Sequence, residues 1–244
     1  MNRLLVDIGN TRVKWALARA ADFIEQNRFV WELGAMQRLL DCQWGQLDRP
    51  ESIAISNVAG DVIEEAVTDW CRKNWSINPD IAVVSRKACG VTNSYSQPQQ
   101  LGIDRWLAIL GGWSMVKGSV CVIDCGSAVT IDVLDANGVH QGGLIAPGLS
   151  LSARALTDHT HALNAEVRKN FPMLASSTED AINSGCYHQF IGGIQYMIGR
   201  IRQQFGSSIQ FIITGGDAEQ VIHAIDDELI SEPDLVLKGL MLIK

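Results

Sequence analysis

The sequence lacks the features that mark membrane proteins, secreted proteins and proteins with cysteine-bound metals. The apolar start of the chain is interrupted at Asp7, too early for a signal peptide. No uncharged apolar stretch approaches the roughly 20 residues that span a bilayer. The six cysteines are scattered and include no CxxC pair, so a disulfide framework is not expected. These absences predict a protein of the reducing cytoplasm.

Positive charge is also in short supply. The chain has 20 Lys and Arg against 27 Asp and Glu, a net charge of -7, which offers no general attraction to nucleic acid or to an anionic membrane. The P-loop sequence GxxxxGK[ST] does not occur, so a phosphate site must be built from other parts. The 244 residues, 47% of them hydrophobic, are enough for two small domains with cores of their own.

What the chain does contain is an internal repeat. Residues 4–18 read LLVDIGNTRVKWALA and residues 121–135 read CVIDCGSAVTIDVLD. In both, an apolar run ends in Asp-x-Gly and a second β-rich run follows, the pattern of a hairpin with a tight turn. We predict two duplicated α/β domains, residues 1–117 and 118–244. The alternative is chance, because Asp-x-Gly turns are common.

Further elements follow each hairpin in the same order. Residues 52–57 and 209–213 read as strands, and Asp61 is the expected N-cap of a helix after the first of them. Residues 104–115 and 178–205 read as helices. The second helix has an apolar face that we interpret as a packing face and as a dimer interface: Tyr187, Ile191, Ile194, Ile198 and Ile201.

The first turn has the composition of a phosphate cradle. Backbone N–H groups, polar side chains and the charge of Lys14 can all contact an anion, and Asp7 can hold Mg²⁺ through water. The alternative is a structural turn with an exposed lysine. The second copy, Asp124 to Thr130, favours the phosphate interpretation, because two such turns can close on one nucleotide. The first segment comprises Asp7, Ile8, Gly9, Asn10, Thr11, Arg12, Val13 and Lys14.

An acid and a base stand side by side at the start of the helix predicted over residues 104–115. The carboxylate of Asp104 can accept the proton of a substrate hydroxyl during phosphoryl transfer. Arg105 can pair with a carboxylate or with the moving phosphoryl group. For an isolated Asp-Arg pair, the alternative is a capping aspartate and a surface arginine.

Together these motifs resemble the actin, Hsp70 and sugar-kinase superfamily, in which ATP lies in a cleft between duplicated domains. Residues 214–217 (TGGD) resemble its nucleoside-side glycine turn. Within that superfamily the chain resembles type III pantothenate kinase. The matching motifs are DIGNT at residues 7–11, Tyr95 followed by GIDR at 102–105, DCGSAVT at 124–130 and GGLIAPG at 142–148.

The resemblance implies ATP-dependent phosphorylation of pantothenate, the first step of coenzyme A biosynthesis, by a homodimer. It makes Asp104 the catalytic base, and it makes Asp124 a ligand of an activating monovalent cation, K⁺ or NH₄⁺. Thr178 would reach substrate in the neighbouring subunit. The implied pantothenate contacts also include Tyr95, Gly102, Ile103, Asp104 and Arg105. The implied ATP contacts are the residues of the first turn, Asp7 to Lys14, together with Ser127, a position that is often threonine in the family.

Two other functions stay open at this point. One is a related kinase acting on another small hydroxyl or carboxyl substrate. The other is a non-catalytic accessory regulator of transcription on the same fold. The joint presence of Lys14, Asp104, Arg105 and Asp124 argues against an inactive scaffold, and the negative net charge argues against direct DNA binding.

Overall fold

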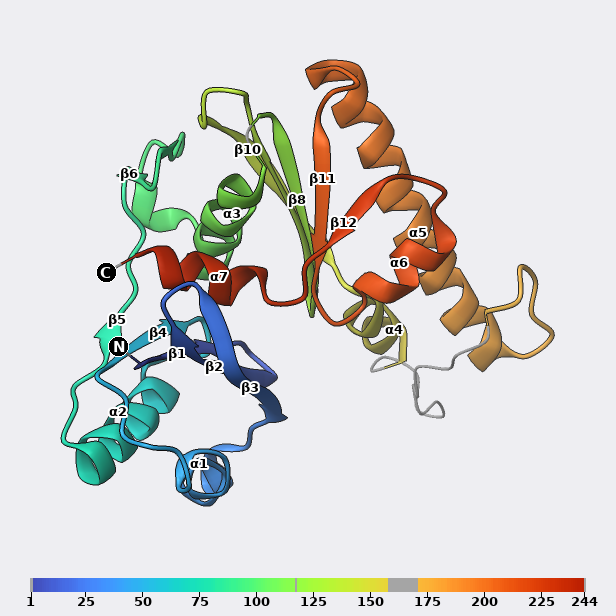
Figure 1. The fold of residues 1–244 in the computed structure, drawn as a ribbon. Coiled ribbons are helices and arrows are strands. Elements are labelled where there is room, and N and C mark those ends of the chain that lie inside the picture. Colours follow the sequence, from blue (N-terminus) through green and yellow to red (C-terminus); the bar gives the residue numbers. More distant parts are fainter. Residues whose placement is uncertain (1, 117, 158–170, 244) are drawn as a thin grey trace. The chain divides into compact units, whose positions relative to one another are not determined.

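The computed structural model describes residues 2–116, 118–157 and 171–243 (Figure 1). The chain divides into two compact units, which are described separately below. Unit 1 contains Met1–Met115 and Asp234–Lys244, and unit 2 contains Val116–Pro233. The expectation that the second domain runs from 118 to 244 is therefore corrected at its end, because residues 234–244 pack with the first unit. The reason is a contact between distant parts of the chain, described below.

Unit 1 is built on a five-stranded sheet with the order β3-β2-β1-β4-β5. The first three strands form an antiparallel meander, and β4 and β5 continue the sheet in parallel. The bounds are β1 Asn2–Ile8, β2 Arg12–Arg19, β3 Asp22–Val30, β4 Ser52–Asn57 and β5 Asp80–Ile81. The hairpin predicted at Asp7-x-Gly9 and the strand predicted at 52–57 are both confirmed.

Helices cover both faces of this sheet. The side chains of Leu4, Val6 and Ile8 alternate along β1 and share one apolar core with α1 (Met36–Trp44) and α2 (Asp61–Trp75). The N-cap of α2 is Gly60, with φ of 96°, so the expected cap Asp61 is instead the first helical residue. There its negative charge still favours the helix N-terminus.

On the opposite face lie α3 (Ile103–Met115) and α7 (Leu235–Leu242). The two helices touch through glycines: a Cβ added to Gly111 would lie 2.5 Å from the carbonyl oxygen of Leu235, and one added to Gly239 would overlap the backbone of Leu107. The side chain of Arg3 adds a hydrogen bond to the carbonyl of Ile243 at 2.7 Å. These contacts hold the last helix on unit 1.

Unit 2 repeats the arrangement with a sheet of the order β10-β9-β8-β11-β12. Again three antiparallel strands are followed by two parallel ones. The same strand order in both units confirms the predicted α/β fold with two duplicated domains. The bounds are β8 Val120–Cys125, β9 Ala128–Leu134, β10 His140–Pro147, β11 Gln210–Thr214, β12 Leu229–Ser231, α4 Leu149–Thr157, α5 Thr178–Phe205 and α6 Ala218–Ala224.

The long helix α5 has the predicted bounds but a different use for its apolar face. It begins after the N-cap Ser177, whose Oγ accepts from the backbone N–H of Asp180, and ends before Gly206. Its isoleucines are buried in the core of unit 2, with Ile194 at 3% and Ile198 at 2% exposure. The interpretation as a packing face is therefore confirmed, and the isoleucines are not available for a dimer interface because the protein's own core covers them.

Candidate active site

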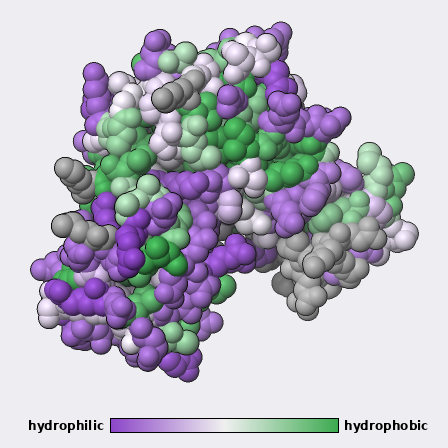
Figure 2. Space-filling view, viewed as in Figure 1, coloured by the Kyte–Doolittle hydropathy of each residue, from purple (hydrophilic) through white to green (hydrophobic). Residues whose placement is uncertain are grey.

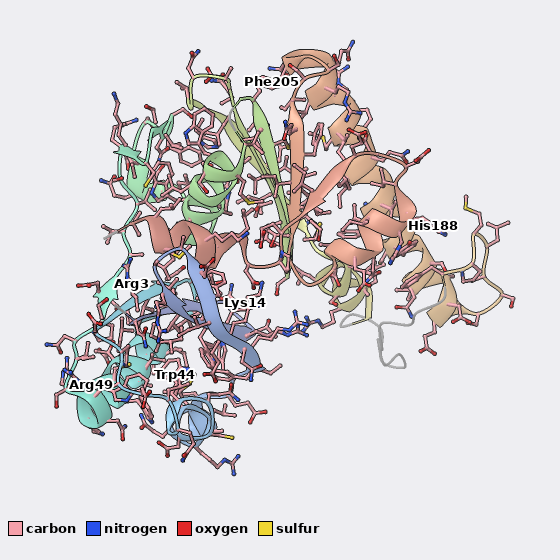
Figure 3. The ribbon with its side chains drawn as sticks, in the orientation of Figure 1. Arg3, Lys14, Trp44, Arg49, His188 and Phe205 are labelled. Atoms are coloured by element: carbon pink, nitrogen blue, oxygen red, sulfur yellow. The ribbon has the colours of Figure 1, made fainter. Side chains whose placement is uncertain are left out.

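The first Asp-x-Gly turn, predicted to be a phosphate cradle, joins β1 to β2 in unit 1. Asp7 is the cross-strand partner of Lys14, and the turn between them closes with a hydrogen bond from the Gly9 N–H to the Arg12 carbonyl at 3.0 Å. Asn10, Thr11 and Arg12 are exposed, and Lys14 lies on the adjoining strand β2 (Figure 3). The sequence therefore presents polar and cationic groups at one hairpin tip, a composition that suits an anion.

A tryptophan just after strand β3 supports this turn. The indole N–H of Trp31 donates to the Gly9 carbonyl at 2.8 Å, and the backbone N–H of Trp31 donates to the Thr11 carbonyl at 3.4 Å. Sequence reasoning missed Trp31. Nothing local marks it, because it lies beyond the end of β3 and reaches the turn only once the meander has formed.

The second Asp-x-Gly turn joins β8 to β9 in unit 2 and has an arrangement similar to that of the first. Gly126 donates to the Ala128 carbonyl at 3.0 Å, as Gly9 does to Arg12, and Ser127 is exposed at the tip. Asp124 pairs with Thr130 across the hairpin and with Thr214 on the parallel strand β11. Its carboxylate therefore sits where two parallel strands end, the edge at which such sheets bind ligands.

Two glycine segments pack directly on the second turn. Gly215, at φ of 98°, leaves no space for a side chain, since an added Cβ would lie 2.5 Å from Asp124 Oδ1. The N–H of Asp217 donates to the Cys125 carbonyl at 2.9 Å, and that of Gly148 donates to the Ser127 carbonyl at 3.1 Å. The motifs DCGSAVT, GGLIAPG and TGGD, which are far apart in sequence, thus meet at one edge of unit 2.

Cys125, inside this second turn, is not a reactive thiol. It is fully buried, and burial raises its pKa well above the ordinary thiol value, with the negative charges of Asp124 and Asp217 adding to the effect. The thiolate is the nucleophilic form, so the protonated Cys125 serves as a small hydrophobic residue.

The acid–base pair lies at the start of α3 in unit 1, as predicted. Asp104 is half-buried in the first helical turn, and its Oδ1 accepts from the Arg105 N–H at 2.8 Å. Arg105 is 6% exposed, and its guanidinium donates to the Tyr95 hydroxyl at 3.1 Å. Unit 1 therefore brings Tyr95 and the GIDR segment together, and Arg105 is not a surface arginine.

Thr178 lies in unit 2, as the first residue of α5, and its side chain is exposed. Within unit 2 it belongs to a different segment from the Asp124 turn. The site residues thus form three groups: the Asp7–Lys14 turn and the Tyr95–Arg105 group in unit 1, and the Asp124–Ser127 turn in unit 2.

The carboxylate oxygens at both turns suit hard cations whose other ligands are phosphate and water oxygens. Within the described ranges no group of three or more His, Cys, Asp or Glu residues is close enough to bind a metal by itself. Each turn supplies one carboxylate at a strand end, Asp7 or Asp124, and oxygen is the ligand that Mg²⁺ and alkali cations prefer. Gly215 packs directly against Asp124, whose carboxylate is the group of the second turn that would hold such an ion. No helix in the described part of the chain is long and apolar enough to cross a membrane.

Solved structures share this architecture. A ROK family glucokinase from Streptomyces griseus, determined with glucose and AMPPNP, superimposes with a TM-score of 0.53 over 98% of both chains, at 10% identity. A Campylobacter jejuni protein described as a Baf family transcriptional activator gives a TM-score of 0.59 over 98% of this chain and 95% of its own, at 21% identity. Both show the same sugar-kinase-like fold as this chain.

The sequence specifies the family within that class. The profile of type III pantothenate kinase matches residues 3–200. Proteins of that name from Nitrosococcus oceani and Nitrosospira multiformis are 34% and 35% identical to this chain. Those alignments cover 97% and 100% of this chain and 91% and 92% of the relatives. The chain belongs to the type III pantothenate kinase family and is a kinase with an alcohol acceptor.

Proposed function

We propose that this chain transfers the terminal phosphate of ATP to the hydroxyl of pantothenate, the entry step of coenzyme A synthesis. The observation that carries the proposal is the group at the start of α3, where a half-buried carboxylate, Asp104, adjoins the Arg105–Tyr95 hydrogen bond. A base, a fixed cation and a phenol within one helical turn and one loop suit an acceptor that carries a hydroxyl and a carboxylate.

In the proposed reaction Asp104 accepts the proton of the pantothenate hydroxyl as its oxygen attacks the terminal phosphorus of ATP. The bond from phosphorus to the leaving oxygen of ADP breaks, and the proton passes from Asp104 to solvent. Arg105 holds the substrate carboxylate or the moving phosphoryl group, and Tyr95, Gly102 and Ile103 line the acceptor side. Positioning and charge stabilisation supply most of the catalysis in such transfers.

The two turns are proposed to bind the nucleotide phosphates. The segment Asp7–Lys14 supplies N–H groups, hydroxyls and the Lys14 ammonium, and Ser127 supplies a hydroxyl from the second turn. Mg²⁺ bound through Asp7, and K⁺ or NH₄⁺ bound through Asp124, would neutralise phosphate charge and raise the electrophilicity of phosphorus. We expect the enzyme to work in the cytoplasm.

We further propose a homodimer formed through unit 2, by a different surface from the one that the sequence indicated. A groove of about 410 Å³ runs between β9, β10 and α5. Of the residues that line it, Leu144, Ile145 and Tyr196 are 47%, 66% and 65% exposed. Residues 181–199 include no Asp, Glu, Lys or Arg, so the exposed face of α5 there has no charge. In Figure 2, hydrophobic residues gather over this unit.

A second copy is the occupant that fits, because the same patch offers both protruding and receding parts. The highly exposed Ile145 and Tyr196 line the groove together with Cys186, which is buried, and Gly193, which has no side chain. A two-fold interface needs one patch that is complementary to itself. An Ile145→Glu variant should sediment as a monomer. The matched control is Ile24→Glu, on the 47% exposed Ile24 of β3 in unit 1, which should sediment as the parent does. Equal masses for all three proteins would rule out this surface.

The activity itself is tested by ADP release in a coupled assay. Pantothenate should support turnover, and a panel of sugars and acetate should not. Turnover with one of the panel and not with pantothenate would indicate a related kinase. If the protein binds ATP but shows no turnover with any acceptor, the result would favour the alternative function, a non-catalytic accessory regulator of transcription.

A further inference from the structure

The loop that carries Tyr95 is held from the outside by one arginine. The small hairpin of β6 (Lys87–Ala88) and β7 (Val91–Thr92) sets Arg86 opposite Asn93, whose N–H donates to the Arg86 carbonyl at 2.9 Å. The Arg86 guanidinium then reaches along the loop. Its Nη1 donates to the carbonyls of Asn93 at 3.1 Å and Tyr95 at 2.6 Å, and its Nη2 donates to that of Ser96 at 2.9 Å.

The same loop is held from the inside by Asn93, which is completely buried. Its Oδ1 accepts from the Tyr95 N–H at 2.9 Å, and its Nδ2 donates to the Pro98 carbonyl at 3.3 Å. The Tyr95 peptide is thus fixed on both sides, its N–H by Asn93 and its carbonyl by Arg86. Because its backbone N–H and its carbonyl are both hydrogen-bonded, the backbone of Tyr95 has little freedom to shift, and the point from which its side chain extends is fixed.

Arg86 is exposed, yet its bonds go to main-chain carbonyls of the loop. The planar guanidinium has donors on separate nitrogens in a rigid fork, so it can bind carbonyls of several residues at once. A structural role in the core does not account for this arrangement, because the side chain buries little apolar surface. What the bonds determine is the path of the chain between Asn93 and Ser96.

We infer that Arg86 is a positioning residue for the acceptor side of the active site, acting through Tyr95. The inference rests on the proposed role of Tyr95 as a pantothenate contact. From Arg86 the connection runs through the Tyr95 backbone to its hydroxyl, and from there to Arg105 at 3.1 Å, whose N–H binds Asp104. Loss of the Arg86 bonds moves the phenol away from its substrate, whereas the ATP-binding turn at residues 7–14 is a separate segment of the unit.

The test is the kinetics of Arg86→Met and Arg86→Lys. Arg86→Met removes the donors and keeps a long apolar side chain, so the KM for pantothenate should rise roughly tenfold or more while the KM for ATP stays within about twofold. Arg86→Lys keeps the charge and one cluster of donors, so its KM for pantothenate should fall between those of the parent and Arg86→Met. The matched control is Arg49→Met. Arg49, also in unit 1 (Figure 3), donates to the carbonyl of Trp75 at 2.7 Å and should leave both KM values unchanged.

A double-mutant cycle separates this inference from the proposed function. Tyr95→Phe removes the phenol oxygen, and if Arg86 acts through it, Arg86→Met should raise the KM for pantothenate less in the Tyr95→Phe background than in the parent. Additive effects, or equal rises in both KM values, would overturn the role of Arg86. An unchanged KM in Tyr95→Phe alone would instead overturn the proposed role of Tyr95.

Discussion

Gly102 lies directly against the carboxylate of Asp104: a Cβ added to the glycine would stand 2.6 Å from Asp104 Oδ1. Because that oxygen is the end of a side chain, the carboxylate would turn away and the backbone would stay. We expect Gly102→Ala to lower kcat by roughly 10-fold or more, since a displacement of this size is costly at a reacting group. Circular dichroism and thermal unfolding should match the parent. A normal kcat in a folded Gly102→Ala variant would contradict the assignment of Asp104 as the group that accepts the proton.

The proposed role of Asp104 as the base gives a stronger prediction. Asp104→Asn keeps the size of the side chain and removes its basicity, so kcat should fall by roughly 10²–10⁴-fold. ATP affinity, measured by isothermal titration in the absence of pantothenate, should stay near that of the parent. Near-normal turnover by the variant would exclude Asp104 as the base.

Cation dependence tests the second turn. If Asp124 binds a monovalent cation beside the phosphates, activity should need K⁺ or NH₄⁺ and should collapse in buffers that contain only Na⁺. Asp124→Ala should reproduce that low rate and should no longer respond to added K⁺. Full activity in Na⁺ with K⁺ rigorously removed would contradict the assignment.

If Thr178 reaches the active site of a neighbouring subunit, two chains with different defects should complement each other. Thr178 is exposed at the first turn of α5, so Thr178→Ala should raise the KM for pantothenate more than the KM for ATP. Mixed with Asp104→Asn chains by co-refolding, it should regain turnover, because one site in each heterodimer has both residues. Specific activity of the mixture is compared with each parent. Heterodimers that show in native mass spectrometry but add no activity would mean that each site lies within one chain.

One ion pair in unit 2 predicts a pH-dependent part of the stability. Arg202 on α5 binds Asp227 through two hydrogen bonds of 2.7 and 2.8 Å. These hydrogen bonds hold the pKa of Asp227 below its ordinary value of 3.8. Between the lowered pKa and 3.8 the unfolded chain binds more protons than the folded chain, so stability falls as the pH drops through this window.

Asp227→Asn should therefore be less stable than the parent from neutral pH down to about pH 5, where the carboxyl is ionised in both folded and unfolded chains. Below pH 3.8 the difference should shrink. The measurement is urea unfolding of both proteins across this pH range. A difference that stays constant down to the acid limit would show that the pair does not titrate as described.

The local elements of this fold can be predicted from the sequence, and their distant partners cannot. The two Asp-x-Gly hairpins and the bounds of α5 follow from apolar runs, turn glycines and a serine cap, all within a few residues of each other. The isoleucines of α5 show that one face of the helix is buried. The spacing of these isoleucines is the same whether the protein's own sheet or a second copy covers them. The sequence alone therefore does not distinguish a core-facing helix from a dimer interface.

The supports of the site were harder to foresee. Asp104, Arg105 and Tyr95 lie in a short segment with a distinctive pattern, and unit 1 brings them together. Trp31 and Arg86 act through hydrogen bonds to main-chain carbonyls, and a carbonyl acceptor leaves no signature in the sequence. Such residues become visible only when the bonds that hold a loop are traced from atom to atom.

The packing of α7 against α3 has a consequence for synthesis on the ribosome. Domains usually fold in the order in which they emerge, and residues 1–115 emerge first. The surface of α3 that Gly239 contacts nevertheless stays bare until residues 234–244 have been made, after all of unit 2. The unit that carries Asp104 is thus started first and completed last. In the interval its unfinished apolar face is available to chaperones, and a stalled or shortened nascent chain would fail in the unit with Asp104 and not in the unit nearest the stall.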